Sequence, residues 1–81
     1  MTSEGILDQL RAVIAKQFNH PIDLIGPSTT ANDVVEWDSL SHAILLVRVE
    51  EAFGIELPED EVFDLRDVAA LSSLVERVLL P

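Results

Sequence analysis

One short stretch, EWDSLSH at residues 36–42, brings together residue types that could do chemistry. Asp38 is a favoured helix N-cap, and the apolar run after it predicts a helix from about Ser39 to Phe53, closed by Gly54. Ser39 is then the first helical residue, with its hydroxyl directed outward. A phosphate at that hydroxyl would lie against unpaired backbone N–H groups and the positive end of the helix dipole. The stretch therefore suits a serine that carries a phosphate ester, although most serines at helix starts serve only in capping.

A serine hydrolase is a second interpretation, because His42 and Asp38 accompany Ser39. Such an enzyme also needs a base aimed at the hydroxyl, a carboxylate that orients the base, and an oxyanion hole. Residues this close on one helix do not supply that geometry, and 81 residues bury too thin a core for a deep pocket. Trp37 at N′ packing on His42 at N4, as a hydrophobic staple, is the simpler interpretation. We therefore expect His42 to be structural and the chain not to be an enzyme.

The acidic stretch PEDEVFDLRD at residues 58–67 raises the question of calcium. An EF-hand loop needs oxygen ligands at alternate positions, a central glycine and a terminal glutamate, and this stretch lacks that spacing. The chain also has no cysteine, which excludes disulfides and thiolate metal sites. We expect no dedicated metal site.

Helical spacing of apolar residues predicts an all-α fold, a small four-helix bundle with three longer helices and one short one. Thr2 or Ser3 caps the first helix, which ends near Pro21, and Asp67 caps the last. Pro58 begins a short helical turn. We expect residues 1–81 to form one domain, free-standing and monomeric. Between the first two long helices lies a long loop, pinned to the core through Leu24, Ile25, Val34, Val35 and Trp37.

The helix after Asp38 is expected to have two apolar faces. One face suits the core and contains Leu45, Leu46, Val49 and Phe53. The second contains Leu40, Ala43, Ile44 and Val47, with Glu50 and Glu51 in the same sector. Because a small bundle seldom covers one helix on both sides, we expect this second stripe to be partly exposed as a protein-docking patch. The alternative is that the long loop covers it.

The formal net charge is −10, from 15 acidic and 5 basic residues. Residues 50–67 alone carry eight acids and one base, either as a solvated surface or as part of a docking surface. This charge disfavours nucleic acid and anionic lipid and favours partners with basic surfaces. The apolar runs are too short to insert into a membrane, and the first residues lack a signal-peptide pattern, so we expect a cytoplasmic protein.

The sequence resembles the phosphopantetheine-binding carrier proteins, the acyl carrier proteins and their peptidyl relatives. The likeness lies in DSL at residues 38–40, which opens an apolar helix that closes with EEAFGIELP, and it continues through EDEVF to DLRDVAALSSLVERV. It covers nearly the whole chain. The triplet alone is weak evidence, whereas its distance from EEAFGIELP in an acidic helical chain of this length is strong.

The resemblance implies that Ser39 carries a covalent 4′-phosphopantetheine arm, flanked by Asp38 and Leu40 of the motif. A phosphopantetheinyl transferase would add the arm from coenzyme A, and its thiol would hold acyl groups as thioesters for acyl-loading and acyl-transfer enzymes with basic docking surfaces. The residues that match the family's partner-recognition helix are Leu40, Ala43, Ile44, Val47, Glu50 and Glu51.

One departure concerns the residues before the motif. Many carriers of fatty-acid synthesis read Asp-Leu-Gly-x-Asp-Ser-Leu, whereas this chain reads DVVEWDSL, without the glycine. The form WDSLSH is more similar to carriers of dedicated lipid, polyketide or other specialised pathways. A peptidyl or aminoacyl carrier has the same site with a different cargo. An unmodified acidic helical adaptor that binds through the same face is the alternative from another class.

Overall fold

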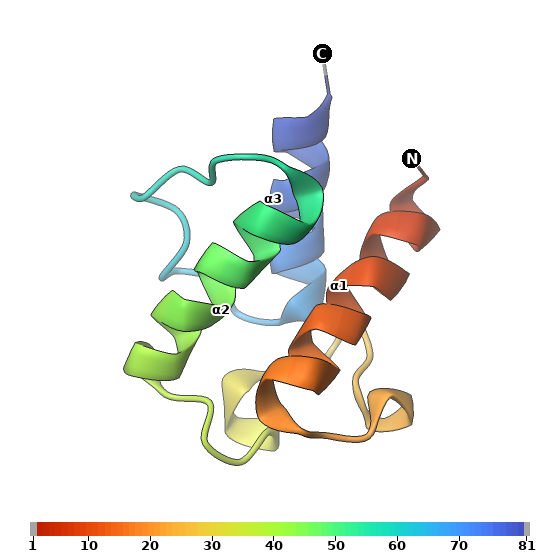
Figure 1. Cartoon of the computed structure of the whole chain (residues 1–81), viewed down its shortest axis with the longest axis vertical. Coiled ribbons are helices and arrows are strands. Elements are labelled where there is room, and N and C mark those ends of the chain that lie inside the picture. The colour runs from red at the N-terminus through yellow and green to blue at the C-terminus, as the bar shows by residue number, and fades with distance from the viewer. Residues whose placement is uncertain (1, 81) are drawn as a thin grey trace.

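Three α-helices and two short 3-10 turns make up the regular structure (Figure 1). They are α1 (Ser3–Phe18), η1 (Ile22–Leu24), η2 (Ala31–Asp33), α2 (Ser39–Phe53) and α3 (Val68–Leu79). The computed structural model describes residues 2–80, and it assigns no strand among them. The predicted all-α class is therefore confirmed. In this described part, no helix combines the length and apolar character that crossing a membrane requires.

The helix ends follow the predicted local chemistry. Thr2 accepts a hydrogen bond from the backbone N–H of Gly5 at the start of α1, and Asp67 accepts one from Ala70 at the start of α3. Gly54 ends α2 with a φ of 65°, a left-handed conformation that costs glycine little because it has no Cβ. The predicted bounds of α2, Ser39 to Phe53, are those of the structure.

The predicted short fourth helix is a series of turns at residues 59–63. The N–H of Glu61 donates to the carbonyl of Pro58 at 3.1 Å, so the helical turn expected at Pro58 does form. It does not continue as a helix: the next backbone hydrogen bond, from the N–H of Asp64 to the carbonyl of Glu61, is 3.4 Å long, and the carbonyl of Val62 accepts from a side chain of α2, the imidazole of His42. The segment is thus tied to α2 instead of propagating its own hydrogen bonds.

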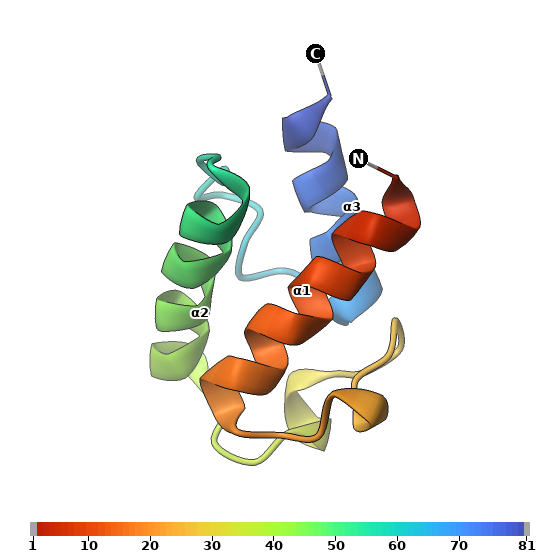
Figure 2. The same ribbon diagram turned by 45° about the vertical axis from the view of Figure 1, so that its right-hand side comes forward.

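Helix α1 is the centre of the arrangement, since it packs against α2, α3 and η1. Figures 1 and 2 show the long loop crossing the end of the bundle where α2 begins. The core combines buried residues from all three helices with a few from the connections. They are Ile6, Leu10, Ile14, Ile25, Leu45, Leu46, Val49, Leu57, Val62, Val68, Leu71, Leu74 and Val75.

The loop between α1 and α2 is held by hydrogen bonds from its backbone carbonyls to α1 and α3. The guanidinium of Arg11 donates to the carbonyls of Ile22 and Ile25. At the other side, the N–H groups of Val68 and Ala69 at the start of α3 donate to loop carbonyls. Because these contacts satisfy backbone groups that would otherwise be unpaired, the loop is ordered although its regular structure is limited to the short 3-10 turns η1 and η2.

The apolar residues of this loop behave differently from one another. Ile25 and Val34 are buried, and Trp37 is half-buried, as predicted for residues that pin the loop. Leu24 and Val35 are exposed, so the prediction was wrong for these two. Leu24 lies in η1, which Arg11 already anchors through its backbone, so that its side chain is not needed for attachment.

Glu36 has an unusual backbone conformation just before α2. The N–H of Trp37 donates to the carbonyl of Val34 at 3.3 Å, closing a turn in which Glu36 is the third residue, with a φ of 73°. This turn position normally takes glycine, since a Cβ disfavours positive φ. Glu36 also stands where the glycine of the Asp-Leu-Gly-x-Asp-Ser-Leu pattern would fall. The Ser41 hydroxyl donates to the Glu36 carbonyl at 2.7 Å and helps to hold this conformation.

Replacing Glu36 with glycine should therefore stabilise the protein. We expect Glu36→Gly to raise the free energy of unfolding by about 1 kcal/mol, because relief of the left-handed strain exceeds the added entropy of the unfolded chain. Urea denaturation measures the change. Glu36→Ala is the control, since it removes the charge but keeps the Cβ. An equal gain in both variants would assign the effect to charge and contradict the strain argument.

Candidate functional site

The start of α2 is built by reciprocal hydrogen bonds between Asp38 and Ser41. The Asp38 carboxylate accepts from the Ser41 N–H at 2.9 Å, and the Asp38 N–H donates to the Ser41 hydroxyl at 2.8 Å. This capping box fixes the first turn without using the hydroxyl of Ser39. Ser39 is exposed at the first helical position, and Leu40 beside it is 73% exposed. The serine therefore faces solvent at the positive end of a fixed helix.

The capping carboxylate is itself stabilised in its charged form. The backbone N–H of Ser41, and after it the Ser41 hydroxyl, hold the pKa of Asp38 below its ordinary value of 3.8. Asp38 is thus ionised at neutral pH, beside Ser39, and its negative charge also interacts favourably with the helix dipole.

His42 makes two hydrogen bonds whose directions can be assigned. The indole N–H of Trp37 can only donate, so the Nδ1 atom of His42, 3.0 Å away, is the acceptor. The proton of the neutral ring is then on Nε2, which donates to the carbonyl of Val62 at 2.8 Å. The predicted contact between Trp37 and His42 is confirmed, with a hydrogen bond in addition to stacked rings. Because both ring nitrogens are engaged, His42 is not available as a base for Ser39.

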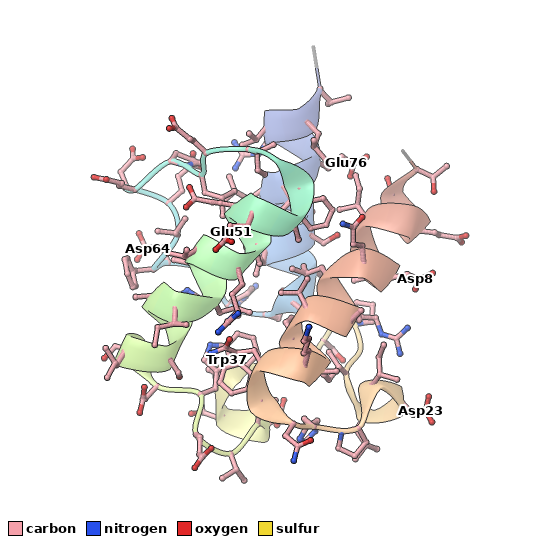
Figure 3. The ribbon with its side chains drawn as sticks, in the orientation of Figure 1. Asp8, Asp23, Trp37, Glu51, Asp64 and Glu76 are labelled. Atoms are coloured by element: carbon pink, nitrogen blue, oxygen red, sulfur yellow. The ribbon has the colours of Figure 1, made fainter. Side chains whose placement is uncertain are left out.

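Four aromatic rings form a continuous row next to Ser39. Phe18 of α1 stacks on Trp37 with ring centres 5.1 Å apart, and Trp37 stacks on His42 at 6.0 Å. Phe63 meets His42 edge to face at 5.5 Å. Trp37 accordingly lies between α1 and α2 in Figure 3, whereas the labelled acids Asp23 and Asp64 point outward. The row links α1, the loop, α2 and the turn segment at the place where Ser39 emerges.

A cleft of about 320 Å³ opens beside Ser39, between the start of α2, the turn segment and the start of α3. Its wall includes the rings of Trp37, His42 and Phe63, and Asp38, Ser39 and Arg66 contribute polar atoms. The remaining lining residues are Thr29, Ala31, Leu65, Asp67 and Leu71. The site is therefore an exposed hydroxyl at the mouth of a largely apolar cleft.

The second face of α2 is uncovered, as predicted. Val47 is 53% exposed and Ile44 is also exposed, while Ala43 is partly buried. The long loop does not cover this face, because it crosses the end of the bundle instead (Figure 2). The partner residues expected from the sequence, Leu40 through Val47, therefore lie together on one open side of the helix.

The two acids expected on this face lie on opposite edges of it. Glu50 shares a groove with Ala43 and Val47, and its carboxylate accepts from the N–H of Leu57 at 2.8 Å. Glu51 is exposed and lines a different groove, toward α1. Glu50 thus has a structural task that the sequence interpretation did not anticipate, whereas Glu51 projects from the surface.

Three features of the site were missed from the sequence. Ser41 was assigned only a position between the faces, although its spacing from Asp38 is that of a capping box. Phe63 and Arg66 were not identified as neighbours of Ser39. They come from a connection distant in the sequence, and no periodicity indicates where such a segment folds back.

The chain is similar to known proteins in both sequence and fold. A family model described as "Phosphopantetheine attachment site" matches residues 8–75. An acyl carrier protein of Acidothermus cellulolyticus is 34% identical over 68 residues, covering 84% of this chain and 81% of that protein. One from Thermosynechococcus vestitus is 29% identical, covering 84% of each chain. The solution structure of holo acyl carrier protein from Geobacter metallireducens matches with a TM-score of 0.80 and 34% identity, over 90% of this chain and 84% of that one.

The lowered pKa of Asp38 gives a pH-dependent contribution to stability. A carboxyl group whose pKa is lower in the folded state stabilises that state at pH values above its pKa in the unfolded chain. This contribution is lost as the pH falls through the pKa of the folded state. We expect wild type to be more stable than Asp38→Asn at pH 7, and the difference to shrink below pH 3.8. Asparagine keeps the cap but does not titrate. Urea midpoints at pH 7 and about pH 3 test this, and a constant difference would contradict it.

Proposed function

This chain belongs to the phosphopantetheine-attachment family, and from this premise we propose that it is an acyl carrier whose prosthetic arm is attached to Ser39. The proteins of this family carry a covalent 4′-phosphopantetheine group and are carriers, not catalysts. We propose residues 1–81 as one carrier domain that works in the cytoplasm. The observation that carries the assignment to Ser39 is its exposed hydroxyl at the capped start of α2.

The residues around Ser39 fit attachment of a phosphate. Asp38 and Ser41 satisfy each other within the capping box, which leaves the Ser39 hydroxyl outside these bonds. The first N–H groups of α2 and the helix dipole favour a negatively charged group at this place. In the modification, the Ser39 oxygen forms a bond to the β-phosphorus of coenzyme A, and adenosine 3′,5′-bisphosphate leaves. The hydroxyl proton passes to a base of the separate transferase.

The proposed mechanism is transport. The bound arm supplies a terminal thiol that holds an acyl group as an activated thioester. The protein supplies a rigid attachment point, because the capping box and the hydrogen bonds of His42 fix the start of α2 against the turn segment. No residue of this chain is needed as acid or base, consistent with the engagement of both nitrogens of His42.

We propose that transferases and acyl-handling enzymes bind the open face of α2. Leu40, Ile44 and Val47 supply exposed apolar contact, and Ala43 lies among them. The acids at the edges, Glu50 and Glu51, provide a negative field that steers basic partner surfaces. Contacts of this kind favour fast and reversible docking, as a carrier that visits several enzymes requires.

A more specific part of the proposal concerns the biosynthetic pathway in which the carrier works. The form WDSLSH, without the glycine of the Asp-Leu-Gly-x-Asp-Ser-Leu pattern, supports a dedicated lipid, polyketide or other specialised pathway. A peptidyl or aminoacyl carrier remains the alternative cargo type. The relatives in the comparisons bear the name acyl carrier protein, which favours an acyl cargo.

Replacing Ser39 tests the attachment site directly. With coenzyme A and a broad-specificity phosphopantetheinyl transferase, wild type should gain the mass of one phosphopantetheine group, and Ser39→Ala should gain none. Intact mass spectrometry measures the adduct. Ser73→Ala is the control, since it removes an exposed hydroxyl from α3, away from the start of α2, and should still be modified. An adduct on Ser39→Ala would disprove this attachment site, and a wild type without an adduct would favour an unmodified adaptor.

Docking on α2 should depend on both charge and apolar contact. We expect Ile44→Ala to raise the KM of the transferase reaction roughly five- to tenfold, because an interface apolar contact contributes on the order of 1 kcal/mol. Leu24→Ala, which alters an exposed apolar residue of η1, is the control and should leave KM unchanged. Added salt should raise KM for wild type by screening the acids. A salt-independent KM would contradict electrostatic steering.

A further inference from the structure

Helices α2 and α3 are connected mainly through α1. No Cα atom of α2 lies within 8 Å of a Cα atom of α3, whereas α1 packs against both helices. Figure 2 accordingly shows α2 and α3 apart from each other. The cleft beside Ser39 lies between their first turns, and its lining includes Leu71 of α3 and Arg66 of the connection before α3. A contact across this cleft would therefore join two parts of the fold that have few direct ties.

The charges around the cleft leave an excess of negative charge. Its lining contains two acids, Asp38 and Asp67, and one base, Arg66, which gives a formal charge of −1. Both carboxylates already accept backbone N–H groups at the starts of their helices. A phosphodiester on Ser39 would change the formal charge to −2. The modification thus places a second source of repulsion beside the two capping carboxylates, unless a cation offsets it.

Arg66 is the basic residue that is placed to offset this charge. The chain has five basic residues, and all of them lie in the described part. Arg11 donates to loop carbonyls, and Arg77 takes part in an ion pair. Lys16 and Arg48 line a separate groove between α1 and α2. Arg66 alone of the five lines the cleft, it is exposed, and the ion pairs found among residues 2–80 do not include it.

The chemistry of the guanidinium group suits a phosphodiester. A phosphodiester has two non-bridging oxygens that share one negative charge. The planar guanidinium presents N–H donors in a fixed fork, which can donate to both oxygens at once, whereas an ammonium group acts as a point charge. The first N–H groups of α2 favour the same anion from the other side. Arg66 and the start of α2 are therefore complementary to a phosphodiester that lies between them.

We propose that Arg66 is a positioning residue for the prosthetic group, which pairs with the phosphodiester on Ser39. The inference rests on the proposed function, because this ion pair exists only after the arm is attached. The pair joins the start of α2 to the connection that leads into α3. Attachment of the arm therefore stabilises the domain itself, and the first atoms of the arm are held at the protein surface.

The experiment treats the modification and the loss of Arg66 as the two changes of a thermodynamic cycle. Apo and holo forms of wild type and of Arg66→Gln are prepared, and intact mass verifies the loading of each holo form. The measured quantity is the melting temperature of the holo form minus that of the apo form, at low salt. We expect this difference to be larger in wild type than in Arg66→Gln by roughly 2–4 °C, as for a partly exposed ion pair in a domain of this size. High salt should reduce the effect.

Two further variants separate local pairing from total charge. Arg48→Gln removes the same charge outside the cleft, so its holo-minus-apo difference should equal that of wild type. Arg66→Lys keeps the charge but lacks the fork, so it should retain only part of the effect. A reduction of equal size in Arg48→Gln and Arg66→Gln would assign the effect to net charge and overturn the proposal.

The phosphorus nucleus of the arm gives a readout that a merely structural role of Arg66 would not move. The ³¹P resonance of the holo form reports the surroundings of the phosphodiester directly. We expect its chemical shift to differ between wild type and Arg66→Gln, and to be the same in wild type and Arg48→Gln. An identical shift in wild type and Arg66→Gln would overturn the ion pair.

The outcomes distinguish this proposal from the proposed function. If Ser39 is modified but the holo-minus-apo difference is the same in wild type and Arg66→Gln, the role of Arg66 is wrong and the attachment site stands. If Ser39 gains no phosphopantetheine, the proposed function is wrong instead. Apo Arg66→Gln should melt cooperatively, as wild type does, because Arg66 is exposed and contributes to neither ion pair found among residues 2–80.

Discussion

The hydrogen bonds of His42 are the constraint on which the arrangement around Ser39 depends. The imidazole connects the indole N–H of Trp37 on one side with the carbonyl of Val62 on the other. Three segments that are separate in the sequence, the end of the long loop, the first turn of α2 and the turn segment, are thereby fixed to one ring. Partly buried polar groups of this kind are costly to leave unpaired. A substitution that breaks one of these hydrogen bonds therefore destabilises the protein through the group that loses its partner.

This constraint explains why a chain of 81 residues can offer both an exposed serine and a preformed cleft. Helix α2 uses one face for the core, through Leu45 and Val49, and leaves the opposite face open. With its first turn locked by the capping box and by His42, the helix does not need the open face for its own stability. The exposed apolar residues of the face proposed to meet partners and the Ser39 hydroxyl are therefore both free of structural duties, while the buried face and the cap supply the rigidity.

The sequence predicted those features that local chemistry determines. Asp38 and Gly54 predicted the bounds of α2 because caps and left-handed glycines act within a few residues. The contact of Trp37 with His42 was predictable for the same reason, as it spans one helical turn.

The cleft was not predictable, because Phe63 and Arg66 reach Ser39 only after the turn segment folds back. Leu24 shows the limit of hydropathy, since Arg11 anchors its loop through carbonyl groups that no side-chain pattern reveals. The hydrogen bond between His42 and Val62 was hidden in the same way, because it joins residues that are 20 positions apart.

The acidic stretch at residues 50–67 illustrates how structure divides a charge cluster that looks uniform in the sequence. Three of its eight acids have structural partners, because Glu50 accepts from Leu57, Glu61 pairs with Arg77, and Asp67 caps α3. The other five acids, Glu51, Glu56, Glu59, Asp60 and Asp64, are exposed. Like charges this close repel one another in the folded state, and a partner with a basic surface relieves that repulsion when it binds. The proposed steering field thus belongs mainly to residues that contribute little to folding. Exchanging those five acids should alter the rate of association far more than the stability of the domain, whereas exchanging Asp67, whose carboxylate caps α3, should do the reverse.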